Sequence, residues 1–158
     1  MHEKYNVNQT KNTLLVNNSF TGIDNKPVIL FDTLKLNPAI IEFYFVGCKP
    51  CEEKLNYLKM IYEEFWKREL KIILICDGTA SSYNQFIKHW QKNKYQGIVF
   101  LYDSDSTISE YNIEGYPTEL MTDGHFIVKQ EKGFGNSMAK DWLYRERFLI
   151  NKILNREK

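Results

Sequence analysis

The amino-acid sequence predicts an α/β domain in which a mixed β-sheet carries helices on both faces. Two nearly continuous apolar segments, Ala39–Val46 and Lys71–Cys76, have the composition of buried strands. Segments with a helical spacing of apolar residues follow each of them. The pair Asp123–Gly124 is a strong hairpin signal late in the chain. Strands that alternate with helices and end in an antiparallel hairpin imply a mixed sheet.

Length and composition narrow the class of protein. The 158 residues have the length of one domain with a substantial core, and 43% hydrophobic residues exclude a disordered chain. Because 20 acidic residues balance 21 basic ones, we expect no nucleic-acid partner. No apolar run reaches the roughly 18 residues of a membrane span. We expect a flexible N-terminal segment at 1–12, which lacks the apolar stretch of a secretory signal, and one domain at 13–158.

The first half of the chain predicts short N-terminal strands, a central strand and a long helix. These are an edge strand at Thr13–Val16, an apolar run at Val28–Phe31 after the turn Asp24–Pro27, the central strand Ala39–Val46, and a helix from Cys51 with Leu55, Leu58, Tyr62 and Phe65 on its apolar face.

The second half predicts two more strands, a hairpin and three helices. These are the strand Lys71–Cys76, a helix capped by Ser81 or Ser82, the strand Ile98–Tyr102, a short helix at Ser106–Tyr111, the hairpin strands Thr118–Thr122 and His125–Gln130, and a last helix capped by Ser137 and ending near Asn155. We expect core positions for the aromatic residues Phe65, Trp66, Trp90 and Trp142, and surface positions for His89 and His125.

The motif Cys48-Lys49-Pro50-Cys51 stands between the central strand and the long helix. Unpaired backbone N–H groups, the helix dipole and the charge of Lys49 should lower the pKa of Cys48. Pro50 is tolerated because the N–H that it lacks has no acceptor in the first helical turn. We therefore expect an exposed, attacking Cys48, and a Cys51 that is shielded one turn further in and resolves the mixed disulfide.

Two other interpretations of the motif do not involve thiol–disulfide exchange. Half of a zinc site has the same spacing, but zinc would need two more ligands from Cys76, His2, His89 and His125, and the chain has no second CxxC. The two thiols could also be structural. We expect no metal and no cofactor apart from the redox-active disulfide Cys48–Cys51.

Gly115-Tyr116-Pro117-Thr118 stands directly before the predicted hairpin. Alone, this Gly-x-Pro sequence is typical of a turn. Together with the CxxC motif it makes the chain resemble the thioredoxin-like superfamily, and more narrowly the TlpA/ResA branch of extracytoplasmic thiol–disulfide oxidoreductases. The resemblance covers most of residues 19–130. It implies a thioredoxin-like fold with an N-terminal β extension and a cis-proline loop at Pro117 that faces the cysteines.

The resemblance also implies roles for the residues of the site. Lys49, Pro50, Tyr116, Pro117 and Thr118 would bind the substrate. Glu42 stands six residues before Cys48, where thioredoxin-like proteins often hold a buried acid. Its pKa should rise on burial, and it could then exchange a proton with Cys51; the alternative is a carboxylate at a wet edge.

The chain departs from the branch at two places. The aromatic stretch before the first cysteine lacks the usual tryptophan and reads Phe43–Gly47, where Gly47 should leave Cys48 more open. Glu119 replaces an apolar residue after the proline loop, which puts the partner-binding surface in question. We expect Cys76 to be a buried free thiol, and Asp77 to be a turn residue or a second acid near the site.

The resemblance implies a monomeric thiol–disulfide oxidoreductase. Its partners would be cysteine-containing protein substrates and an upstream thiol redox partner, outside the cytoplasm, although the residues themselves leave a cytoplasmic location open. The alternative is a thioredoxin-fold interaction module with a structural or vestigial disulfide. A peroxidase would be expected to carry a Thr/Ser-rich, proline-containing loop before its reactive cysteine. The sequence does not distinguish reductase, oxidase and isomerase.

Overall fold

The computed structural model of the chain describes residues 7–8 and 13–156, so that most of the expected flexible segment 1–12 lies outside the described residues. The described strands form one sheet in the order β1-β9-β8-β5-β6-β7-β3-β4, and β2 pairs with β9. They are β1 Val7–Asn8, β2 Thr13–Leu14, β3 Ser19–Thr21, β4 Pro27–Ile29, β5 Ala39–Tyr44, β6 Lys71–Asp77, β7 Ile98–Asp103, β8 Thr118–Thr122 and β9 Phe126–Lys132.

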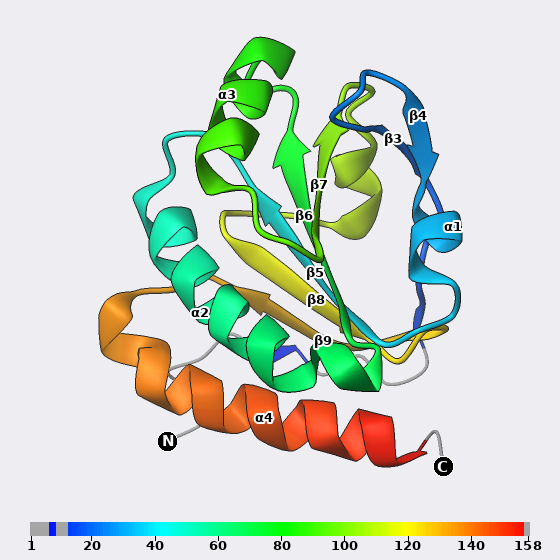
Figure 1. Ribbon diagram of the computed structural model, residues 1–158, viewed down its shortest axis with the longest axis vertical. Helices are drawn as coiled ribbons and strands as arrows, with labels where there is room; N and C mark the ends of the chain where they lie inside the picture. Colours follow the sequence, from blue (N-terminus) through cyan, green and yellow to red (C-terminus); the bar gives the residue numbers. More distant parts are fainter. Residues whose placement is uncertain (1–6, 9–12, 157–158) are drawn as a thin grey trace.

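Four α-helices and three 3₁₀ turns connect and cover these strands in the described part of the chain (Figure 1). They are α1 Leu30–Leu34, α2 Lys49–Phe65, η2 Trp66–Arg68, α3 Tyr83–Asn93, η3 Thr107–Tyr111, η4 Asn136–Met138 and α4 Ala139–Arg156. Strands β5, β6 and β7 are mutually parallel, whereas β8 is antiparallel to both β5 and β9. The predicted mixed sheet with an N-terminal β extension is confirmed.

Alternate residues of the central strand β5 serve two separate cores, because successive side chains of a strand point to opposite faces. Ile40 and Tyr44 belong to a core that includes residues of α2, α3 and α4. Ile41 and Phe43 belong to a second core, with α1 and η3. Glu42 shares the face of Ile40 and Tyr44, and this parity directs its carboxylate toward α2. In Figure 1, α2 and α4 lie side by side over this face of the sheet.

Local boundaries differ from the sequence expectations at two places, and the cap of α3 agrees with them. The apolar run Val28–Phe31 is divided, because β4 ends at Ile29 and α1 begins at Leu30. Ser82 caps α3 in a reciprocal capping box with Gln85. Ser137 does not cap the last helix: it lies inside η4, whose final amide bonds back to the Gly135 carbonyl at 2.9 Å, and α4 begins at Ala139.

The aromatic residues are only partly where they were expected. Phe65 and Trp142 are buried, as predicted, whereas Trp66 is 47% exposed and Trp90 is half-buried. The prediction for Trp66 is wrong because α2 ends at Phe65 and η2 turns the next residue away from the apolar face. Helical spacing beyond the end of a helix does not predict a shared face.

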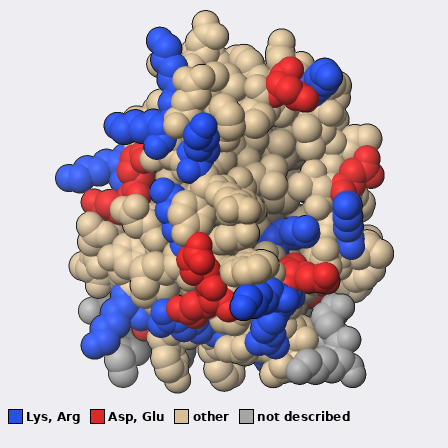
Figure 2. All heavy atoms as spheres, in the orientation of Figure 1, with Lys and Arg blue, Asp and Glu red and all other residues tan. Residues whose placement is uncertain are grey.

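The described surface mixes charges of both signs. In Figure 2, Lys and Arg side chains lie next to Asp and Glu side chains, above all over the lower part of the face shown. Among the described helices, none combines the length and the hydropathy that a bilayer crossing requires.

Candidate active site

The two cysteines of the motif are joined in a disulfide at the N-terminus of α2. Cys48 is the N-cap residue, and its Cα lies 5.2 Å from that of Cys51. The Cys51 backbone N–H donates to the Cys48 Sγ, with 3.3 Å between N and S. A free N–H of the first helical turn thus points at the Cys48 sulfur, where it would stabilise a thiolate.

Cys48 is buried, so the expectation of an exposed sulfur is wrong. Its exposed fraction is 4%, against 7% for Cys51. The Cys48 amide donates to the Phe45 carbonyl at 3.3 Å, and Gly47 adopts a φ of 93° in this turn. The turn folds the chain back instead of opening it, and both sulfurs join the apolar core between the sheet and α2. Gly47 and Lys49 are the exposed residues beside the disulfide.

The proline loop lies beside the residues that precede the cysteines. The Tyr116–Pro117 peptide bond is cis, as expected. The Tyr116 ring meets the Phe45 ring edge to face, with 5.5 Å between ring centroids. The Tyr116 hydroxyl donates to the Asp77 carboxylate at 2.6 Å. Asp77 therefore positions the loop, and it also accepts from the Thr79 amide as a turn residue would.

Hydrogen bonds favour the ionised form of the Asp77 carboxyl group. Partial burial opposes ionisation, but the bonds from Tyr116 and Thr79 outweigh it and hold the pKa of Asp77 below its usual value. Burial and the bond to Asp77 raise the pKa of the Tyr116 hydroxyl above its ordinary range. The pair is thus a neutral donor bound to an anionic acceptor.

The residues expected to meet a substrate differ in accessibility. Lys49 is exposed, and Pro50 and Tyr116 are half-buried. Pro117 and Thr118 are buried, and the Pro117 carbonyl accepts from the Gly133 amide at 2.7 Å. A partner that approaches the disulfide therefore meets the Lys49 side and Tyr116 before it meets Pro117 or Thr118.

Glu42 is buried below the disulfide, which excludes the wet-edge alternative. Its exposed fraction is 2%, and the Lys54 ammonium lies 3.0 Å from Oε1. No described residue donates a hydrogen bond of good geometry to either Glu42 oxygen. Burial is the main reason why the pKa of Glu42 is raised to about 7; Glu119 adds to the shift and Lys54 opposes it.

Glu119 lies directly opposite Glu42 in the register of β5 and β8. It is fully buried, with Lys54 at 3.1 Å, Lys129 at 3.2 Å and the Trp142 indole N–H donating at 3.0 Å. Burial disfavours the anion, but the two ammonium groups outweigh it and hold the pKa of Glu119 well below its usual range. Glu119 therefore belongs to the core and not to an accessible surface, and its carboxylate stays ionised while Glu42 titrates near neutrality.

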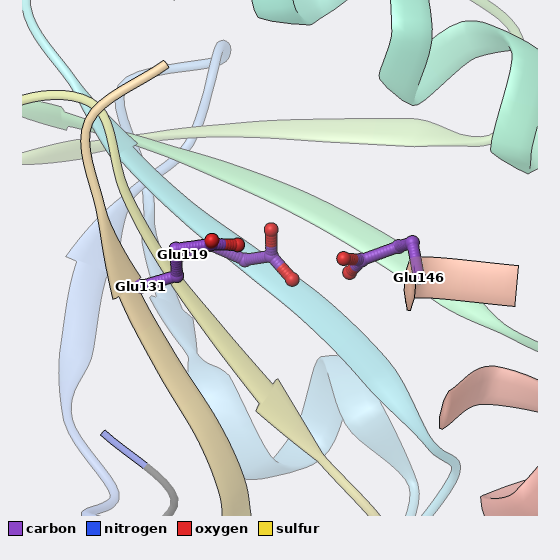
Figure 3. A group of neighbouring side chains, drawn as sticks. All are labelled: Glu119, Glu131 and Glu146. Carbon is purple, nitrogen blue, oxygen red and sulfur yellow. The ribbon is translucent and has the colours of Figure 1, made fainter. Parts of the chain in front are cut away.

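Glu119, Glu131 and Glu146 form an acidic group whose side chains converge from β8, β9 and α4 (Figure 3). The Lys129 ammonium contacts all three carboxylates, at 3.2, 3.1 and 2.5 Å. Arg145 also contacts Glu131, at 3.0 Å. Lys129 and Arg145 thus join the three carboxylates in one buried network that links α4 to the sheet.

Sequence reasoning missed the buried charges of this network, although a signal for them is present. Lys54 lies between Cys51 and Leu58 on the inner face of α2. Buried and half-buried residues alternate along β9, and Lys129 and Glu131 occupy buried positions of this pattern, as Ile127 does. Glu146 lies one turn after Trp142. Charged residues of both signs at core-facing positions of three elements predict ion pairs between those elements.

Two further residues complete the surroundings of the site. The expectation of a surface position for His89 is wrong: its side chain is 8% exposed, and Nε2 lies 2.6 Å from the Glu52 carboxylate. His89 is three residues after Phe86, on the buried face of α3. Cys76 is a buried free thiol, as predicted, and burial raises its pKa to about 11.

The raised pKa of Glu42 predicts a loss of stability as pH rises. Below the ordinary glutamate pKa of 4.5, Glu42 is protonated in both the folded and the unfolded chain; between 4.5 and about 7 the unfolded chain ionises first. The free energy of unfolding should fall across this window by about 3 kcal/mol on account of Glu42. In Glu42→Gln the free energy of unfolding should fall less between these two pH values. Urea unfolding at both ends of the window measures the difference.

The matched control for this prediction is Glu53→Gln, which removes a carboxylate from the first turns of α2 outside the ion-pair network. In Glu53→Gln the free energy of unfolding should fall with pH as steeply as it does in the wild type. Glu146 also has a raised pKa, so some slope should remain in Glu42→Gln. Equal slopes in the wild type and in Glu42→Gln would contradict the assignment.

Comparison with known protein families gives a match over most of the chain. A family model described as "AhpC/TSA family" matches residues 6–133. The thiol-disulfide oxidoreductase ResA of a Bacillus cereus strain is 26% identical over 104 residues, which cover 65% of this chain and 58% of the relative. ResA of Geobacillus kaustophilus is 25% identical over 96 residues, covering 58% and 52%. The chain thus spans less than two thirds of the length of these relatives.

Solved structures show the same fold. A putative thiol:disulfide interchange protein DsbE from Chlorobium tepidum superposes with a TM-score of 0.78 at 14% identity, covering 93% of this chain and 99% of its own. The thioredoxin domain of a thiol-disulfide oxidoreductase from Bacteroides vulgatus gives a TM-score of 0.69 at 20% identity, covering 89% and 99%. The predicted thioredoxin-like fold is confirmed.

Proposed function

We propose that this chain, which belongs to the AhpC/TSA family, is a thiol–disulfide oxidoreductase that exchanges disulfides with cysteines of partner proteins. One observation carries the proposal: the Cys48–Cys51 disulfide lies at a helix N-terminus, and Cys51 shares a cavity wall with the buried Glu42. The activity in the names of the ResA relatives supports it. A structural disulfide would need neither the helix N-terminus nor the acid.

The exchange proceeds in two steps. In the reducing direction, the Cys48 thiolate attacks the partner disulfide, bonds to one partner sulfur and releases the other as a thiolate. Cys51 then gives its thiol proton to the Glu42 carboxylate and attacks the Cys48 sulfur. The Cys48–Cys51 bond forms, the second partner thiolate leaves, and one electron pair has passed from the two cysteines to the partner. The reverse steps oxidise partner thiols.

Substrate contact would involve the accessible residues around the disulfide. Lys49 and Pro50 flank it on α2, and the half-buried Tyr116 lies on the loop side, where an extended partner segment could pair with the backbone in the manner of an added strand. Pro117 and Thr118 would support that backbone from below. An upstream thiol partner would restore the starting redox state. The resemblance to the TlpA/ResA branch supports an extracytoplasmic location and a monomer.

The test is reduction of insulin disulfides by the reduced protein, together with the reduction potential measured against glutathione. We expect insulin reduction and a potential above the roughly −300 mV that marks structural disulfides. Alkylation and peptide mass spectrometry should find Cys48–Cys51 paired and Cys76 free. Cys76→Ala serves as the matched control and should retain both properties. A potential far below that value, with no insulin reduction, would instead support the interaction module with a structural disulfide.

A further inference from the structure

A small cavity lies between β5, α2 and α3, next to the disulfide. Its volume open to a water-sized molecule is about 10 Å³, which is the room needed by one water. Its walls include Glu42, Tyr44, Cys51, Glu52 and His89. One small space therefore touches Cys51, the buried acid and a histidine–glutamate pair.

Two polar atoms on these walls have no partner in the described part of the protein: the Oε2 of Glu42 and the Nδ1 of His89, both buried. The other Glu42 oxygen, Oε1, has the Lys54 ammonium at 3.0 Å. A buried polar atom that is left without a hydrogen bond is costly, so these atoms favour a bound water that joins them. The Tyr44 hydroxyl, which faces the same region, has the Cys76 thiol as its neighbour.

The other ring nitrogen of His89 faces a different environment. Nε2 lies 2.6 Å from the Glu52 Oε1, and the Glu52 side chain is 41% exposed. The imidazole thus lies between the buried part of the cavity, where Glu42 is, and a carboxylate with contact to solvent. An imidazole can take up a proton at one nitrogen and release another proton from the second nitrogen.

The charged groups that act on Glu42 in the described part of the chain are themselves buried. They are Lys54 from α2, Glu119 from β8 and Lys129 from β9. The groups that face His89 are Glu52 from α2 and the rings of Tyr44 and Phe100 from β5 and β7. Among these groups, Glu52 is the titratable one with contact to solvent.

We infer that His89 and Glu52 form the proton route between Glu42 and solvent, with one water in the cavity linking Glu42 to the His89 Nδ1. This inference deepens the proposed function, on which its role in thiol exchange rests. In the outward direction Glu42 gives its proton to the water, the water gives one to Nδ1, and the Nε2 proton passes to Glu52 and then to bulk water. The water and Glu52 return to their starting states, and no electrons move. His89 is left with its proton on Nδ1 instead of Nε2, and the inward transfer, in which Glu52 protonates Nε2 and Nδ1 returns a proton through the water to Glu42, restores the starting tautomer.

The test uses the oxidised protein, in which Glu42 titrates near neutrality, and therefore needs no substrate. A rapid jump from pH 5 to about pH 8 crosses the Glu42 pKa of about 7. Infrared absorption of the neutral carboxyl then follows the loss of the proton from Glu42, and the band is assigned by its absence in Glu42→Gln. General acid–base groups contribute roughly 10²–10⁴-fold when they react directly, so we expect a relay to change the rate by about tenfold.

We expect the carboxyl band to decay about tenfold more slowly in His89→Gln, whose amide can still contact Glu52 but carries no exchangeable charge. Glu52→Gln should also slow it. In His89→Ala the vacated space admits imidazole, and added imidazole should restore the rate. His125→Gln, at an exposed hairpin position, and Glu53→Gln, adjacent to Glu52, are the matched controls and should decay like the wild type.

Equal decay rates in the wild type, His89→Gln and Glu52→Gln would overturn the inference, since the proton would then leave by another path. So would an equal slowing in Glu53→Gln, which would indicate a general effect of charge. A loss of the insulin activity with an intact relay would contradict the proposed function alone. Slow decay in His89→Gln with rescue of His89→Ala by imidazole supports the relay, whatever the partner of the disulfide is.

Discussion

Replacement of Cys51 by serine is expected to turn the protein into a trap for its partners. Cys48 would still attack a partner disulfide, but no sulfur would remain to displace the partner from Cys48. Covalent complexes should accumulate, visible as shifted bands on non-reducing gels and released by a thiol reductant. Net exchange should fall to background. Mass spectrometry of the released proteins would identify the partners.

The matched variant Cys48→Ser should form no complexes and show no exchange. Exposure does not distinguish the two sulfurs, since both are nearly fully buried in the disulfide form. The assignment therefore depends on the N–H of Cys51, which points at the Cys48 sulfur and would stabilise its thiolate. Trapping by Cys48→Ser but not by Cys51→Ser would reverse the roles and contradict that electrostatic argument.

Replacement of Lys54 by methionine is expected to cause the largest loss of stability. The Lys54 ammonium lies 3.0 Å from Glu42 and 3.1 Å from Glu119, all within the core. Methionine keeps the length of the apolar stem but leaves the carboxylates with less compensation. Removal of one partner of a buried ion pair costs about 3–5 kcal/mol, and we expect a loss of this size in the free energy of unfolding near pH 8, measured in urea.

The pH dependence separates this effect from lost packing. Without Lys54 the pKa of Glu42 should rise further above 7, so at pH 5 Glu42 is neutral and the cost should be smaller. The double variant Lys54→Met with Glu42→Gln should lose less than the sum of the single variants. Lys88→Met, on the outer side of α3, is the control and should stay within about 0.5 kcal/mol of the wild type. A cost independent of pH would indicate packing alone.

Much of the architecture follows from local sequence patterns. The apolar runs became β5, β6 and β7, and Asp123–Gly124 lies in the turn between β8 and β9. These features depend on interactions between neighbours in the chain and on burial of whole strands. The helix boundaries were harder: Ser137 and Trp66 were placed wrongly because 3₁₀ turns flank α4 and α2, and such turns follow no apolar periodicity.

The candidate site was likewise predictable only in part from the sequence. The CxxC motif, the proline loop and Glu42 were all recognisable in the sequence, because each belongs to a short motif or a fixed spacing. The exposure of Cys48 was not, since it depends on how the turn after Phe45 packs. The position of His89 was not either, because its partner Glu52 lies on another helix, 37 residues earlier.

The sequence by itself determined the fold class, the redox motif and the presence of an acid on the central strand. The tertiary structure alone decided the charge states around that acid. Glu42 and Glu119 are the same residue type on adjacent strands, yet Glu119 has two ammonium partners and an indole donor, whereas Glu42 has one ammonium. A buried carboxylate ionises according to the groups that reach it through space, and Lys54, Lys129 and Trp142 reach this pair from α2, β9 and α4.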